Sequence, residues 1–156
     1  MASMNELVRE LRVNEIVNAL VAAFRAGNRD YISSVAELLH EEFTYIVSES
    51  TELTGDVLRR ASILHALYCL SLGMLRLLGN EVFTVNPVEL LRIAVDSGDM
   101  SGLTQSLVVA SALLIKGDLS WVEEFNGVVQ GVGNELFRGI LSSFLEVVRA
   151  VRVVSP

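Results

Sequence analysis

Residues 61–75 have the sequence ASILHALYCLSLGML, and residues 100–115 have the sequence MSGLTQSLVVASALLI. Neither stretch contains Asp, Glu, Lys or Arg, and both are apolar on nearly every side of a helix. A helix of this kind is normally surrounded by other helices. Both stretches are shorter than the roughly 20 residues that a membrane-spanning helix needs. We therefore expect two buried core helices and no membrane span.

A stripe of small residues follows the first of these stretches. Ser62, Ala66, Cys69 and Gly73 recur at helical spacing, three or four residues apart. Residues at this spacing share one side of a helix, and small side chains let a neighbouring helix approach closely. The stripe predicts a packing seam.

Helical periodicity covers nearly the whole chain, and no run alternates strictly as a half-buried strand does. Ser3 and Glu6 form a capping box, as do Ser120 and Glu123, and Asn86 with Pro87 marks another helix start. In the helix expected to follow Asn28, the buried side includes Tyr31, Val35, Leu38, Leu39, Phe43 and Ile46. About seven helices are expected, over residues 3–27, 28–47, 56–78, 86–98, 99–117, 120 to the glycines at 127–133, and 134–153.

The same dipeptide type stands at four of the expected helix ends: Gly27-Asn28, Gly79-Asn80, Gly98-Asp99 and Gly117-Asp118. A glycine at the helix end followed by Asn or Asp as a cap is typical of short joints between helices, and short joints connect antiparallel hairpins. These joints predict a single all-α domain over residues 1–156, an irregular helical bundle. The alternative is a short α-solenoid, because the near-regular spacing resembles tetratricopeptide-type hairpins, although the rest of that family's pattern is missing.

Charge and cysteine content narrow the class of protein. The formal net charge is −7, which argues against a nonspecific grip on nucleic acid. Charged residues from Glu6 onward interrupt any secretory signal, and the lone Cys69 permits no disulfide framework. We therefore expect a cytoplasmic protein.

The two histidines are candidate metal ligands. Glu37 and His40 match the E-x-x-H pattern by which a helix supplies two ligands to a carboxylate di-iron site. Such a site needs a second copy of the pattern, but Ser62 stands three residues before the only other histidine, His65. We expect no metal and no cofactor, with His40 on a solvated helix face.

Arg59 and Arg60 stand in the first turn of the helix expected over 56–78, at the positive end of its dipole. Glu49, Glu52 or Asp56 can compensate for this within the chain; an anion or an acidic partner surface can do so equally. Trp121 is a further candidate for partner contact, or it packs its ring on a neighbouring helix.

Arg60 and His65 form an R-x4-H pattern that resembles the signature of HEPN-type ribonucleases, small all-α proteins that cut RNA at a dimer cleft. The resemblance implies His65 as acid–base and Arg60 as the phosphate-stabilising cation. It covers six residues, and Leu67 stands where that family commonly has Tyr. The apolar surroundings of His65 favour a core histidine instead.

High hydrophobicity, hairpin organisation and the lack of a catalytic constellation favour a non-enzymatic scaffold or assembly subunit. Apolar residues make up 51% of the chain, which an apolar surface facing a protein partner or a second copy would explain. The alternative functions are the ribonuclease with Arg60 and His65, and a small-ligand pocket between helices.

Overall fold

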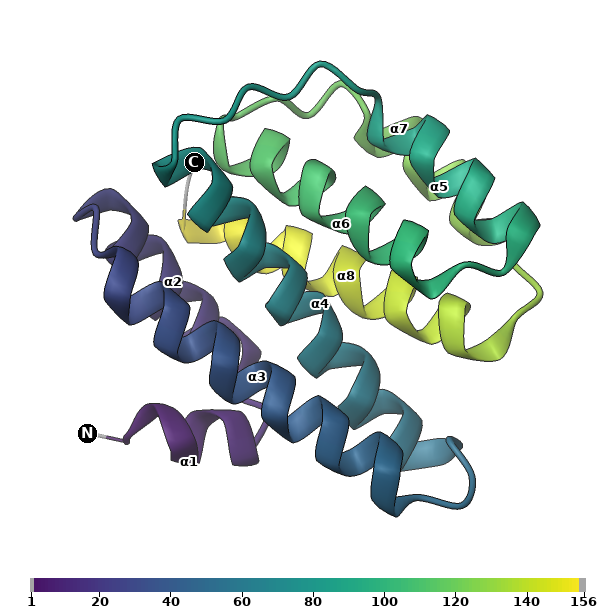
Figure 1. Ribbon diagram of the computed structural model, residues 1–156, viewed down its shortest axis with the longest axis horizontal. Coiled ribbons are helices and arrows are strands. Elements are labelled where there is room, and N and C mark those ends of the chain that lie inside the picture. Colours follow the sequence, from purple (N-terminus) through teal and green to yellow (C-terminus); the bar gives the residue numbers. More distant parts are fainter. Residues whose placement is uncertain (1, 155–156) are drawn as a thin grey trace.

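The computed structural model describes residues 2–154, and within them the chain forms eight helices (Figure 1). These are α1 (Met4–Arg9), α2 (Val13–Arg25), α3 (Arg29–Glu49), α4 (Gly55–Leu78), α5 (Pro87–Ser97), α6 (Met100–Ile115), α7 (Val122–Gln130) and α8 (Glu135–Val154). The predicted all-α fold is confirmed.

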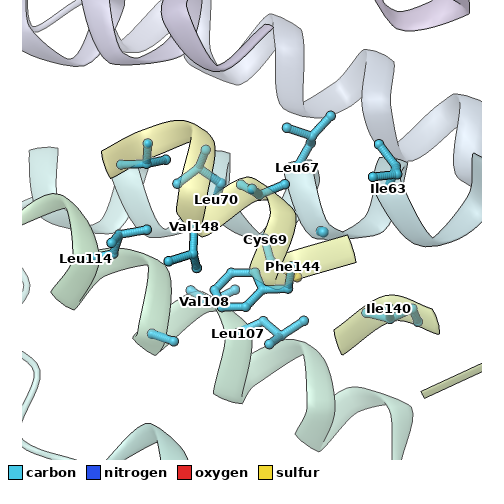
Figure 2. Packing of buried hydrophobic residues seen from close by; sticks show 14 of the residues in the cluster. Ile63, Leu67, Cys69, Leu70, Leu107, Val108, Leu114, Ile140, Phe144 and Val148 are labelled. Carbon is cyan, nitrogen blue, oxygen red and sulfur yellow. The ribbon is translucent and has the colours of Figure 1, made fainter. Parts of the chain in front are cut away.

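Helix α4 lies at the centre of the molecule (Figure 1). It contacts α2 and α3 on one side and α6 and α8 on the other, while α5 and α7 pack together beyond α6. All eight helices contribute buried side chains to one apolar cluster. Figure 2 shows buried residues of this cluster, among them Cys69 of α4, Val108 of α6 and Phe144 of α8.

The two uncharged stretches are core helices, as predicted. Residues 61–67 of α4 and 106–112 of α6 are buried without interruption. By length and composition alone α4 could cross a membrane, but 67% of its most apolar 18-residue window is buried inside the protein. Since core helices of soluble proteins have the same length and composition, this is weak evidence for a span.

The stripe of small residues is a packing seam for two helices. A β-carbon added to Gly73 would lie 2.9 Å from Ser111 Cβ and 2.9 Å from the Val108 carbonyl oxygen of α6. A β-carbon added to Gly139 of α8 would lie 2.8 Å from Ser62 Oγ. Helices α6 and α8 therefore approach α4 closely at different points along the same stripe.

The prediction of one continuous helix over 3–27 is wrong. Helix α1 ends after Arg9, and Leu11 adopts a left-handed conformation with φ of 54°. The N–H of Arg12 donates to the carbonyl of Leu7 at 2.9 Å, which closes the helix end. This turn redirects the chain so that α1 packs against α2 and α3, with Leu7 and Val8 buried.

Most predicted caps are present. The N–H of Glu6 donates to Ser3 Oγ, and side chains of Asn28, Asn86 and Asp99 accept bonds from the first turns of α3, α5 and α6. Gly98 ends α5 in the left-handed conformation with φ of 68°.

The second predicted capping box does not form. Ser120 Oγ donates to Asp118 Oδ1 at 2.7 Å, and α7 begins after Trp121 without a side-chain cap. The bonds from the Ser120 side chain and backbone lower the pKa of the exposed Asp118.

The prediction that Tyr31 lies on the buried side of its helix is also wrong. Tyr31 is 37% exposed, because its neighbour Ile32 occupies the buried side of α3.

The chain closes on itself, as in an irregular bundle. Helix α8 contacts α2 as well as α4, and Arg25 donates to the carbonyl of Val154 at 3.0 Å. In a solenoid each repeat would contact only its neighbours in sequence. The contacts between α2 and α8 therefore contradict the solenoid alternative.

Candidate functional site

A groove of about 670 Å³ opens to solvent between α3 and α4. Its floor comes from α4, where Tyr68, Leu72 and Leu75 are partly exposed at helical spacing. One side of α3 forms its wall. The lining residues are Asp30, Ser33, Ser34, Ala36, Glu37, His40, Glu41, Tyr68, Leu72 and Leu75.

The groove follows from side-chain size on α3. The lining residues of α3 share one side of that helix, because they repeat every three or four positions: 30, 33, 34, 37, 40 and 41. Ser33 and Ser34 are short and exposed, so they leave uncovered the larger Leu72 and Leu75 of the neighbouring helix. The hollow therefore has an apolar floor and a polar rim.

The groove is also acidic. Asp30, Glu37 and Glu41 line it, and no Lys or Arg of the described residues does. Within residues 2–154, none of these three carboxylates forms an ion pair. A hollow lined by charges of one sign beside apolar walls focuses the electric field and attracts the opposite charge.

His40 lies on the α3 wall of this groove and stacks on Tyr68 of the floor, with ring centroids 4.9 Å apart and planes 29° apart. Glu37, its partner in the E-x-x-H pattern, lines the same groove. The two residues thus belong to a shared surface with Tyr68.

His65 lies behind this surface and is only 6% exposed. Its Nε2 is 2.9 Å from Thr104 Oγ1, and its ring packs 4.9 Å from the ring of Phe43. Since the Thr104 hydroxyl donates to the carbonyl of Met100 at 3.0 Å, it accepts from His65, which places the proton on Nε2. Within the described chain, the buried Nδ1 has no hydrogen-bond partner.

Burial, with a smaller contribution from nearby His40, lowers the pKa of His65 to about 4. The side chain is therefore neutral at pH 7. Because the unfolded chain, with a pKa near 6.5 at this residue, binds the proton more readily, protonation favours unfolding. The stability that depends on neutral His65 is present above pH 6.5 and is lost as the pH falls toward 4.

The two arginines form contacts within the chain. Arg59 pairs with Glu146 of α8 at 3.4 Å, and Arg60 donates to the carbonyl of Arg9 at 2.6 Å. That carbonyl lies at the negative end of α1, where a cation is stabilising. Arg60 also lies 4.0 Å from Glu42. These partners differ from Glu49, Glu52 and Asp56, which sequence proximity suggested.

The ribonuclease hypothesis requires Arg60 and His65 to meet RNA together. In the described chain, His65 is buried against Thr104 and Phe43, while the Arg60 guanidinium holds the end of α1. The fold does not present the two side chains as an exposed pair.

Trp121 is 4% exposed, and its indole N–H donates to the carbonyl of Asp118 at 2.8 Å. Its ring packs edge-on against Phe125 and also contacts Phe144. The ring is a core element that fixes the start of α7, which corresponds to the second of the two interpretations of Trp121 made from the sequence.

The apolar sequence of residues 61–75 predicts that Tyr68, Leu72 and Leu75 lie in the core, because α4 is apolar on nearly every side. Which side stays uncovered depends on the neighbouring helix. The sequence does contain one indication of the groove: the short residues Ser33 and Ser34 stand next to each other on the acidic side of α3.

The chain was compared with protein-family models, with curated proteins and with solved structures, and no match was found in any of the three comparisons.

Proposed function

We propose that this chain is a non-enzymatic scaffold or assembly subunit that works by protein–protein contact, and that the groove between α3 and α4 is its contact surface. The observation that carries the proposal is the partly exposed apolar floor of Leu72 and Leu75 beneath a polar rim. Protein interfaces have the same anatomy, an apolar centre that is buried on association and a polar edge.

The size and openness of the groove suit a partner segment. A volume of about 670 Å³ lies within the range of roughly 300–1,000 Å³ seen for ligand sites, and this groove opens to solvent. The groove can therefore receive a side chain of a partner segment from solvent.

Site-specific photo-crosslinking tests the proposal. A photoreactive residue replaces Ser34 inside the groove or, as a control, the exposed Thr44 on the same helix but outside the groove. After irradiation in cells of the source organism, we expect a covalent protein adduct from position 34 and none from position 44. Ser34→Trp, which fills the groove, should prevent capture of the same partner by co-purification.

Light scattering separates a second copy from a different partner. A mass that rises to that of a dimer with concentration, and falls back in Ser34→Trp, identifies self-association through the groove. A chain that stays monomeric and gives no groove-specific adduct would contradict the proposal.

The ribonuclease alternative remains a prediction with its own test. RNA is incubated with wild type and with His65→Ala, after circular dichroism has shown that the variant is folded. Cleavage by wild type alone supports the ribonuclease hypothesis. Equal cleavage by both proteins, or cleavage by neither, contradicts it.

A further inference from the structure

We infer that the partner segment held in the groove between α3 and α4 is a basic amphipathic helix. Its apolar side would cover Leu72 and Leu75, and its Lys or Arg side chains would meet Asp30, Glu37 and Glu41. This inference rests on the proposed function, since it names the kind of partner that the groove accepts.

The shape of the groove favours a helix. Helix α4 forms its floor and the adjacent α3 forms its wall, and a helix packed on another lies at an interaxial distance of roughly 8–10 Å. The wall from Asp30 to Glu41 spans about 16 Å along α3, at about 1.5 Å per residue. This length corresponds to about three turns of a bound helix. A binding mode by strand addition needs an open sheet edge, and the described chain contains only helices.

The floor sets the apolar pattern of the partner. Leu72 and Leu75 follow Tyr68 at the fourth and seventh positions, so they form a ridge along α4. A helix laid on such a ridge contacts it with side chains at i, i+3 or i+4, and i+7.

The charges of the groove set the polar pattern of the partner helix. Asp30, Glu37 and Glu41 lie along one wall without ion pairs inside residues 2–154, and no Lys or Arg of these residues lines the groove. A partner with Lys or Arg beside its apolar stripe would satisfy all three, whereas an acidic partner or a nucleic acid backbone would be repelled. Because these charges lie at the solvent-exposed rim, they govern the association rate and its salt dependence more than the final packing.

The probe is a set of fluorescein-labelled peptides of about 14 residues, slightly longer than the three turns that the groove accommodates. Leu, Ile, Phe or Met stand at i, i+3, i+4 and i+7, and Lys fills the remaining positions. A second set replaces every Lys with Glu. Fluorescence anisotropy measures binding of both sets to the full chain. We expect several Lys peptides to bind and the Glu peptides to fail.

Charge-reversal variants locate the binding. The double variant Glu37→Lys/Glu41→Lys should weaken the best Lys peptide about tenfold or more and should gain affinity for its Glu counterpart. The control Glu49→Lys/Glu52→Lys changes the net charge equally at exposed positions outside the groove and should leave both affinities near those of wild type. Circular dichroism verifies that each variant keeps its helices.

Three outcomes overturn the inference: no Lys peptide prefers wild type over Ser34→Trp, the two double variants weaken binding equally, or the Glu peptides bind as well as the Lys peptides. If position 34 still crosslinks to a protein, the proposed function stands and only the basic helix is refuted. If neither crosslink nor peptide binding depends on the groove, both proposals fail.

Discussion

The contact between α4 and α6 gives the sharpest test of the packing, through the substitution Gly73→Ala. The added β-carbon would lie 2.9 Å from Ser111 Cβ, 2.9 Å from the Val108 carbonyl oxygen and 3.0 Å from the Ala112 nitrogen. Two of these three atoms belong to the backbone of α6, so no side-chain rotation relieves the overlap. The helices must separate, and the packing around the seam must loosen.

Two opposing terms decide the size of the effect. Alanine in a helix interior is favoured over glycine by about 1 kcal/mol. Overpacking a closely packed core costs about 1–3 kcal/mol, and a clash with backbone lies near the upper end. The net change at Gly73 is therefore a loss of about 2 kcal/mol of unfolding free energy. For a chain of this size, the midpoint of thermal unfolding should fall by roughly 4–8 °C.

The matched control is Gly127→Ala in α7, where an added β-carbon meets nothing within 4 Å. Only the helix-propensity term remains there, so this variant should gain about 0.5–1 kcal/mol. Urea unfolding followed by circular dichroism measures both variants. A Gly73→Ala variant that is as stable as wild type, or that gains stability as Gly127→Ala does, would contradict the close packing of α4 on α6.

Three further predictions concern buried groups. Between pH 7 and pH 4.5, wild type should lose about 2–3 kcal/mol more unfolding free energy than His65→Gln, because only wild type must take up a proton at His65 on unfolding; urea unfolding at both pH values measures this, and equal losses would contradict it. Thr104→Val should lower the unfolding free energy at pH 7 by about 1–3 kcal/mol, since it leaves the buried His65 N–H without its acceptor, and an unchanged midpoint would count against the assigned bond. Full burial raises the pKa of the Cys69 thiol well above its usual range, so iodoacetamide should modify it only in urea; mass spectrometry detects the adduct, and rapid labelling of the folded protein would refute this.

The helix ends were predictable where local chemistry sets them. Asn28, Asn86 and Asp99 cap helices because their side chains reach nearby N–H groups, and Gly98 ends one because it tolerates positive φ. The break at Leu11 was not predictable in this way. A leucine adopts the left-handed conformation there because tertiary packing of α1 outweighs the local backbone preference.

The candidate site was less accessible from the sequence than the fold. Glu37 and His40 drew attention as metal ligands, whereas in the structure they line a groove with Leu72 and Leu75. Periodicity shows which residues share a side of a helix, but it does not show which sides neighbouring helices leave open. His65 shows the same limit: its spacing from Arg60 matched a catalytic pattern, while its burial depends on the contact with Thr104 of a distant helix.

The contacts of α8 have a consequence for the timing of folding. This helix has 20 residues and packs against α2, α4, α6 and α7, all of which are synthesised before it. At about 5–20 residues per second, a ribosome needs roughly one to four seconds to add it. Until α8 has been synthesised, the apolar sides of α2 and α4 that it contacts are exposed to solvent. The core of the nascent chain is incomplete during this time. We expect the protein to be most prone to aggregation, and most dependent on chaperones, during this interval of its synthesis.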